Sequence, residues 1–170
     1  SAKEYSPLVN QEKVSATALQ ESLALNKTNV MFDTRSDKMV FGRLTINPAE
    51  AANLTGDIKT GVFAGTSETE EVRDVFKKYF KNTVQVIYCE QENFNRYVEI
   101  AVKANGIQEE NLKFYTYDNE TKLYNDLAVA LEYVDDNGYV HFYTNNGGYL
   151  VVSDGPLEKL PKEESSAKEK

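Results

Sequence analysis

Histidine and cysteine are nearly absent from this 170-residue sequence, which holds one of each. Every Ser-His-Asp or Cys-His arrangement, and every histidine-based metal site or general base, would therefore have to use His141. A single histidine is not a constellation, and its place between Val140 and Phe142 in an expected strand favours a structural role. The lone cysteine, Cys89, excludes an internal disulfide and leaves the redox compartment open.

Basic residues are also scarce, because 19 Lys and Arg face 27 Asp and Glu and give a formal net charge of −8. A nucleic-acid backbone or an anionic membrane surface requires a basic footprint, so we exclude both as partners. No apolar run approaches the roughly 18 residues of a membrane-spanning helix, so we also expect no membrane insertion. The sequence shows no phosphate-loop spacing, and we expect no cofactor.

What is present is ordinary globular material, with 41% hydrophobic and 27% charged residues. We predict a single α/β domain over residues 14–154, between a flexible polar segment, 1–13, and a flexible charged tail, 155–170. Because the chain starts at Ser1 and not at Met, we expect that a signal or lipid-anchoring segment was removed or that a longer protein is shown in part. We favour the cell envelope or the cell exterior over the cytoplasm.

The centre of the predicted fold reads strand, helix, strand, helix, strand. The strands are Gly61–Ala64, Thr83–Cys89 and Leu112–Tyr117, and the helices are Ser67–Phe80 and Asn93–Ala104. Apolar residues recur at spacings of three and four in both helices, as in amphipathic helices. Ser67 and Glu70 fit a capping box at the first helix start. Two consecutive β-α-β units imply parallel strands with right-handed crossovers.

Before this centre we expect a helix over residues 14–25, a hairpin of residues 30–32 and 38–46, and a short helix from Pro48 to Leu54. After it, residues 120–134 fit both a helix and a strand. We favour the helix, because the run is long and rich in Leu and Ala.

The sequence Asn145-Asn146-Gly147-Gly148 predicts a tight turn that joins strands 139–144 and 149–153 in a hairpin. Together these elements predict a mixed sheet with a parallel centre, antiparallel hairpins at both ends and helices on both faces.

Ligands of such sheets bind beyond the carboxyl ends of the parallel strands. The crevice candidates are Thr66, Ser67, Cys89, Glu90 and Asp118. A phosphate site is disfavoured, because Glu68, Glu70 and Glu71 fill the first turn of the following helix and would repel an anion. Cys89 could act as a thiolate at a helix start, but Glu90 beside it raises a thiol pKa, and inert packing is the simpler interpretation.

Seven acidic residues follow the expected strand ends, namely Glu68, Glu70, Glu71, Glu90, Glu92, Asp118 and Glu120. We expect them to converge on one edge of the molecule, although helix-dipole complementation explains each acidic turn singly. Such an edge would attract cations, either a divalent metal or a basic partner surface. The sequence leaves metal binding open.

Tyrosine is concentrated late in the chain, with seven of eleven residues from Tyr115 onward. Tyrosine mixed with Asn, Thr and Gly is typical of adaptable recognition surfaces, although strands favour aromatic residues anyway. The candidate binding residues are Tyr139, Tyr143, Asn145, Asn146 and Tyr149.

We therefore favour a non-catalytic binding or adaptor domain, tethered to the cell envelope, that recognises a protein or glycan through this hairpin. One alternative is a small-molecule or cation-binding sensor or enzyme that works at the acidic crevice. Another is an intracellular acidic inhibitor or regulator of a basic partner. The sequence names no catalytic residue and does not indicate the oligomeric state.

Overall fold

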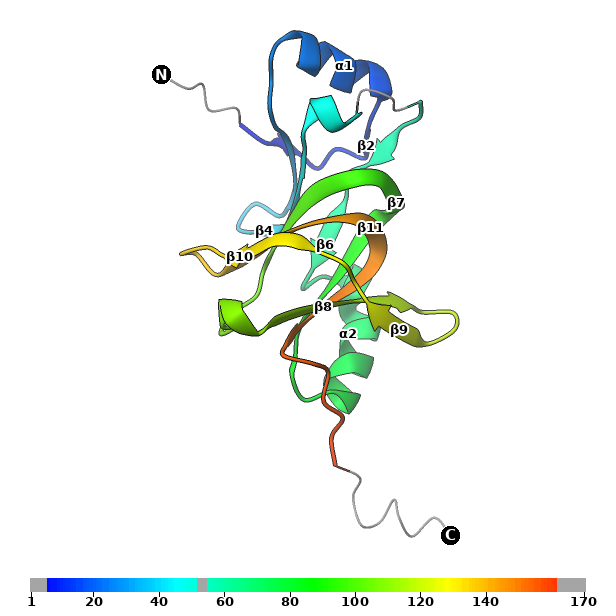
Figure 1. Cartoon of the computed structure of the whole chain (residues 1–170), viewed down its shortest axis with the longest axis vertical. Coiled ribbons are helices and arrows are strands. Elements are labelled where there is room, and N and C mark those ends of the chain that lie inside the picture. Colours follow the sequence, from blue (N-terminus) through cyan, green and yellow to red (C-terminus); the bar gives the residue numbers. More distant parts are fainter. Residues whose placement is uncertain (1–5, 52–54, 162–170) are drawn as a thin grey trace.

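The computed structural model of the chain describes residues 6–51 and 55–161 and shows a strand-rich mixed α/β fold (Figure 1). Its helices are α1 (Ala16–Ala24) and α2 (Ser67–Tyr79), with short 3-10 helices η1 (Pro48–Ala51) and η2 (Glu109–Asn111). Its strands are β1 (Leu8–Val9), β2 (Lys13–Val14), β3 (Val30–Arg35), β4 (Val40–Ile46), β5 (Ile58–Lys59), β6 (Val62–Ala64), β7 (Thr83–Lys103), β8 (Leu112–Asp118), β9 (Leu123–Asp126), β10 (Ala130–Val134) and β11 (Tyr139–Asp154).

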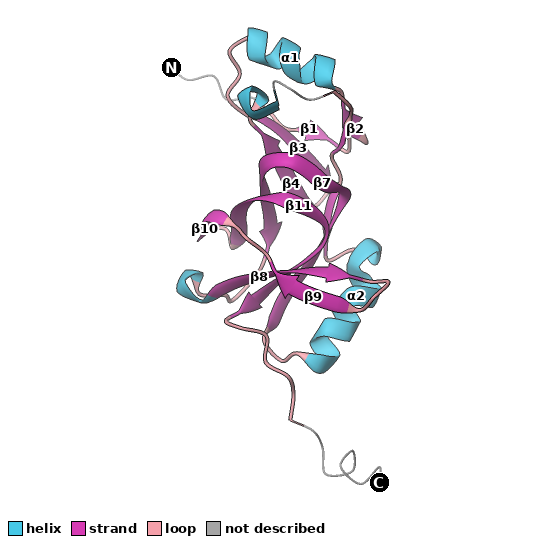
Figure 2. Cartoon of the chain, turned by 45° about the vertical axis from the view of Figure 1, so that its right-hand side comes forward, coloured by secondary structure: helices cyan, strands magenta, loops and turns pink. Residues whose placement is uncertain are grey.

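One large sheet carries the described part of the fold (Figure 2). Its strand order is β1-β3-β4-β7-β11-β8-β9, while β6 pairs with β7 and β10 pairs with β11. The β1–β3 pair is parallel, and the other pairs of this sheet are antiparallel. The predicted parallel centre is therefore wrong. Strand β6 runs antiparallel to β7, and β11 lies between β7 and β8.

The long strands β7 and β11 form a ribbon that both halves of the sheet share. Their pairing runs from Lys103 with Tyr139 to Thr83 with Ser153, with register shifts on both sides of Asn146. Strands β4 and β10 flank one half of the ribbon, and β6 and β8 flank the other. The predicted C-terminal hairpin is wrong, because residues 139–154 continue along β7 as one strand, and the bulges at the glycines bend it.

The second predicted helix, residues 93–104, is also wrong, since these residues form the second half of β7. Val98, Ile100 and Val102 are all buried, and this spacing of two is the period of a strand. Strands β4 and β11 pair with this half on its two edges, and that pairing overrides the local helical spacing. The helix favoured for residues 120–134 is wrong for the same reason, because β9 and β10 lie there.

Local predictions fared better on the N-terminal side. The helices expected over 14–25 and 67–80 are confirmed as α1 and α2. The hairpin expected over 30–46 is confirmed as the antiparallel pair β3 and β4. Pro48 opens η1, while residues 52–54 of the predicted short helix lie outside the described residues.

The predicted capping box at the start of α2 is wrong. Thr66 occupies the cap position, and its side chain makes no capping hydrogen bond. The Ser67 hydroxyl donates to the Glu68 carboxylate at 3.4 Å. The helix start therefore rests on its backbone geometry and on the acidic residues of its first turn.

Two apolar cores lie on opposite faces of the ribbon. Along β11, Leu150 and Val152 belong to the larger core, while Val151 between them belongs to the smaller one. Helix α2 covers the smaller core with Val72 and Phe76. Phe76, Val86, Val98 and Phe114 are buried in these cores, and Val84 is partly buried.

The two predicted flexible ends are described only in part, because residues 1–5 and 162–170 lie outside the described residues. Within the N-terminal segment, β1 pairs with β3 and β2 pairs with β5. Near the C-terminus, Lys159 forms a bridge with Phe80, and the Leu160 N–H donates to the Tyr79 carbonyl at 3.2 Å. Residues of both segments thus pair with strands or contact the end of α2, and β2 and β5 form a separate two-stranded sheet.

Candidate functional site

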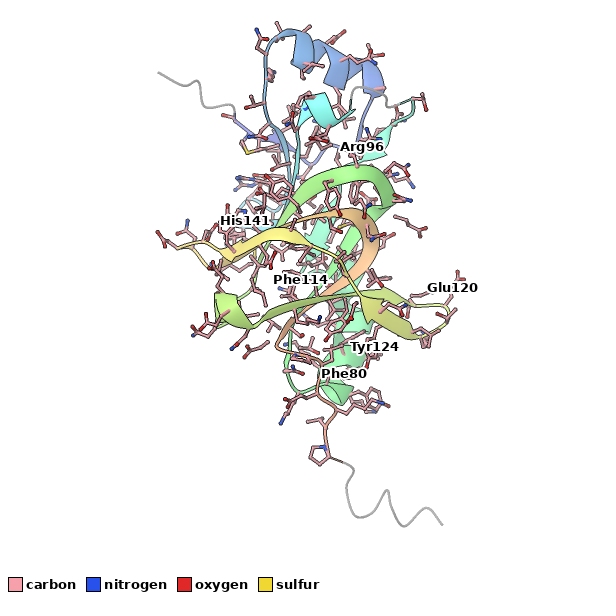
Figure 3. All side chains as sticks on the ribbon, in the orientation of Figure 1. Phe80, Arg96, Phe114, Glu120, Tyr124 and His141 are labelled. Atoms are coloured by element: carbon pink, nitrogen blue, oxygen red, sulfur yellow. The ribbon has the colours of Figure 1, made fainter. Side chains whose placement is uncertain are left out.

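An open groove of about 680 Å³ lies where the β7–β11 ribbon bends beside the β8–β9 turn. Three tyrosines, three carboxylates and two amides are among the residues that line it. They are Tyr88, Tyr117 and Tyr149; Glu92, Asp118 and Glu120; and Asn119 and Asn146. Glu120 sits at the tip of the β8–β9 turn, where it projects away from the body of the molecule (Figure 3). The volume falls in the usual range for a ligand pocket.

The aromatic wall of the groove comes from a cross-strand pair. Tyr88 of β7 stands opposite Tyr149 of β11, and their ring centroids lie 4.8 Å apart. The Tyr149 hydroxyl donates to the Glu68 carbonyl at 3.4 Å, which links the wall to the first turn of α2. Burial, with Tyr88 and Glu71 nearby, raises the pKa of Tyr149, so its hydroxyl keeps its proton. The wall therefore offers uncharged rings.

The acidic side of the groove is shaped by the turn after β8. One oxygen of Asp118 accepts the backbone N–H groups of Glu120 at 2.8 Å and of Thr121 at 3.3 Å. Both hydrogen bonds lower the pKa of Asp118 and keep it ionised, and the one from Glu120 has the larger effect. Neither Lys nor Arg is among the described residues that line the groove. Lys122 lies beside the groove, and its Nζ donates to the Asn119 side-chain oxygen at 2.8 Å. The three lining carboxylates outnumber this cation, so the local charge is negative.

The predicted site residues are distributed over separate places. Asp118, Asn146 and Tyr149 line the groove, and Asn145 is exposed at the bend but does not line it. Tyr139 and Tyr143 line two smaller hollows of about 210 and 220 Å³. All three predicted recognition tyrosines are half-buried, so they are neither core residues nor freely exposed.

The predicted crevice does not form as a unit. Thr66 and Ser67 lie at the start of α2, and the Thr66 hydroxyl oxygen is buried without a hydrogen-bond partner among the described residues. Glu90 donates its backbone N–H to the Gly61 carbonyl at 3.0 Å and does not line the groove. Cys89 is fully buried, and burial raises its thiol pKa to about 12, so it lacks thiolate character.

The chain matches no protein-family model, no curated protein and no solved structure at a significant level.

Of the acidic residues expected to converge, Glu92, Asp118 and Glu120 do line one groove. Within the described part of the chain, no three His, Cys, Asp or Glu side chains are placed to hold a metal ion. No helix of that part is long and apolar enough to cross a bilayer. The groove is thus an acidic, aromatic surface rather than a preformed metal centre.

Several groove residues were missed at the sequence level. Tyr88 and Tyr117 sit in β7 and β8, and nothing in the sequence shows that β11 places them beside Tyr149. Asn119 is part of a polar turn and carries no signal of its own. Glu92 and Glu120 were expected at an acidic edge, which is the signal that could have pointed to the groove.

His141 lies away from the groove residue Glu120 (Figure 3). Three neighbouring side chains contact its ring. Its ring stacks on Tyr133, with centroids 4.4 Å apart and planes 5° from parallel. Its Nε2 atom is 2.8 Å from the Asp135 carboxylate, and Nδ1 makes a longer contact of 3.5 Å with Glu99. Burial lowers the pKa of His141, but the two carboxylates raise it more, so it lies above 6.5. Both ring nitrogens therefore serve structural ion pairs.

We expect His141 to make the protein more stable below neutral pH than above it. Because its pKa is raised in the folded state, the stabilisation is complete below pH 6.5 and is lost as the pH rises through the folded-state pKa. Asp135 acts in the opposite sense. Burial raises the pKa of Asp135, but its hydrogen bonds lower it by more, so the net pKa is lowered. Its contribution to stability is therefore present above pH 3.8 and is lost on acidification.

Urea unfolding from about pH 6 to about pH 9, compared with a variant that lacks the histidine, checks this expectation, because the chain terminus and the unfolded Cys89 thiol also titrate in this range. The variant His141→Asn should show a flatter pH dependence than the parent chain. Glu70→Gln, which removes an exposed carboxylate from α2, should leave the dependence unchanged. Parallel curves for the parent and His141→Asn would show that the ion pairs contribute no pH-dependent stability.

Proposed function

We propose that this protein is a non-catalytic binding domain that holds a neutral or amino-bearing oligosaccharide in the groove at the ribbon bend. The observation that carries the proposal is the combination of the Tyr88–Tyr149 wall with carboxylates and amides, without a lining Lys or Arg. Sugar rings present apolar C–H faces that pack on aromatic rings, and their hydroxyls donate to carboxylate and amide oxygens.

The charge of the groove favours this ligand class over phosphorylated ones. Glu92, Asp118 and Glu120 would repel a phosphate or a nucleotide in this partly enclosed space. The same carboxylates favour an ammonium group, which can also lie against a tyrosine ring. A small-molecule or cation sensor at this groove is the alternative, and a basic protein partner is a further one. The concave shape supports a chain of a few sugar units better than a broad protein surface.

Such a ligand is a common component of cell envelopes, and we therefore propose the envelope or the cell exterior as the site of action, with the cytoplasm as the alternative. The buried, protonated thiol of Cys89 and the ion-paired ring of His141 support a role without covalent or acid–base catalysis.

Adjacent asparagines provide a matched test of the groove. We expect Asn146→Ala to weaken oligosaccharide binding about tenfold, the equivalent of one well-made hydrogen bond. Asn145→Ala should bind like the parent chain, because Asn145 is exposed and does not line the groove. Glu120→Gln should reduce the preference for amino sugars over neutral ones. Affinities are measured by calorimetry after a screen of neutral, amino-bearing and acidic oligosaccharides.

Three results would contradict the proposal. A preference for acidic oligosaccharides would show that the ligand carries a charge opposite to the one proposed. Equal losses for Asn145→Ala and Asn146→Ala would place the ligand outside the groove. Binding of a basic protein, with no oligosaccharide bound, would instead favour the regulator alternative.

A further inference from the structure

A second hollow, independent of the groove, lies on the face of the sheet where β4, β7 and β11 run side by side. In one row across these strands, Arg43 pairs with Ala101, which in turn pairs with His141. The short side chain of Ala101 stands between two long ones, and a hollow of about 210 Å³ opens there. Asp135, Asn137 and Tyr139 complete its polar rim.

The hydrogen-bond acceptors around this hollow are already engaged. Asp33 is buried, at 4% exposure, and accepts Nε of Arg43 at 2.6 Å and Nη2 at 3.0 Å. One oxygen of Asp135 accepts the backbone N–H groups of Asn137 at 2.9 Å and of Tyr139 at 3.0 Å. The other oxygen lies 2.8 Å from Nε2 of His141. The carboxylates of the rim thus hold the site together.

The donors of the hollow, in contrast, have capacity left. A guanidinium carries five N–H groups, and Asp33 engages only the edge of Arg43 that contains Nε and Nη2. Among the described residues, Nη1 of Arg43, the side-chain amide of Asn137 and the Tyr139 hydroxyl have no hydrogen-bond partner. Lys103 adds a positive charge, since its Nζ lies 5.3 Å from the centre of the Tyr139 ring. A ligand that fits this rim is an acceptor.

We propose that this hollow binds a carboxylate, held by the free edge of Arg43 with the Tyr139 hydroxyl and the Asn137 amide beside it. A planar carboxylate matches the guanidinium fork, and Asp33 fixes that fork in place before the ligand arrives. A phosphate fits less well, because its second charge would face the carboxylate of Asp135 in the rim. The small volume suits a short organic acid or the carboxyl end of a peptide.

Sodium acetate is the probe, and backbone ¹⁵N NMR is the readout. We expect saturable shifts at Arg43, Ala101 and Tyr139, with no such shifts for acetamide or sodium chloride. Ala101→Leu fills the hollow and should weaken acetate at least about tenfold, whereas Ala128→Leu, at an exposed position outside the hollow, should leave the affinity unchanged.

Arg43→Lys provides the second variant, because it keeps the charge beside Asp33 but removes the fork, and it should also weaken acetate about tenfold. If Ala101→Leu fails to fold, the loss of acetate affinity in Arg43→Lys still tests the proposal. Unchanged acetate shifts in the folded variants would overturn the proposal and indicate adventitious anion binding. Equal shifts with acetamide would also overturn it, because they would show that the site does not recognise the carboxylate charge.

A pair of peptides that differ only at the carboxyl end separates the two sources of the ligand. Tighter binding of the free-acid peptide than of acetate would assign the site to a polypeptide end, and the reverse order would assign it to a small organic acid. Equal binding of the amidated peptide would overturn the carboxylate assignment. Because the groove variant Asn146→Ala lies outside this hollow, it should bind acetate normally, so failure of one proposal does not decide the other.

Discussion

Replacing Phe76 with alanine is expected to lower the free energy of unfolding by about 3–5 kcal/mol. Phe76 is 1% exposed and fills the centre of the core between α2 and the sheet. Its ring centroid lies 4.9 Å from that of Tyr117, 5.4 Å from that of Phe80 and 6.3 Å from that of Tyr124. Removal of the ring leaves a cavity that these aromatic neighbours cannot fill without losing their own contacts. Urea unfolding of the two chains measures the difference.

Val75 supplies the control for this substitution. It precedes Phe76 in α2 but is 38% exposed, so Val75→Ala should change the stability by no more than about 0.5 kcal/mol. A loss below about 1 kcal/mol for Phe76→Ala would mean that α2 adds little to the stability of the sheet.

The second large effect is expected at the bend of the ribbon. A Cβ atom at Gly147 would lie 1.7 Å from the backbone carbonyl oxygen of Gln91, a separation that real atoms do not reach. The obstacle is backbone on the paired strand, so no rotation of a side chain relieves it. Gly147→Ala is therefore expected to cost about 3 kcal/mol or more, because β7 and β11 must separate at the bend.

The matched control is Gly56→Ala, because an added Cβ at Gly56 meets nothing within 4 Å. That variant should stay within about 0.5 kcal/mol of the parent chain. Thermal and urea unfolding compare the two, and oligosaccharide binding should fall only in Gly147→Ala, since Gly147 lines the groove. Equal stability of both variants would contradict the tight approach of the two strands.

The elements that the sequence predicted correctly are those specified by nearby residues. Helix α2 has an apolar stripe and an acidic first turn, and β3 and β4 flank a polar turn. The run from Phe94 to Val102 instead supports two periods at once, since some apolar residues follow a helical spacing while Val98, Ile100 and Val102 alternate. The choice between them is made by β4 and β11, which are distant in sequence.

The groove was anticipated for partly wrong reasons. The amide and tyrosine content around Asn146 and Tyr149 pointed to a binding surface, and the acidic turns pointed to a negative edge. The sequence predicted that Asp118 would reach this edge at the end of a parallel strand. In the structure, β8 carries Asp118 and pairs antiparallel with β11. The Arg43 hollow was not anticipated, because it depends on the cross-strand register of Arg43, Ala101 and His141.

The ribbon of β7 and β11 also bears on how the chain folds. Both halves of the sheet use it as their template, yet its two strands are joined only after η2, β8, β9 and β10 have been traversed. Closing that distance costs chain entropy before the ribbon's hydrogen bonds can compensate, which places the chain among slow-folding topologies. Once formed, the ribbon couples the two halves, so neither can open fully without the other. The edge strands β9 and β10 can fray independently and should exchange their amide hydrogens first.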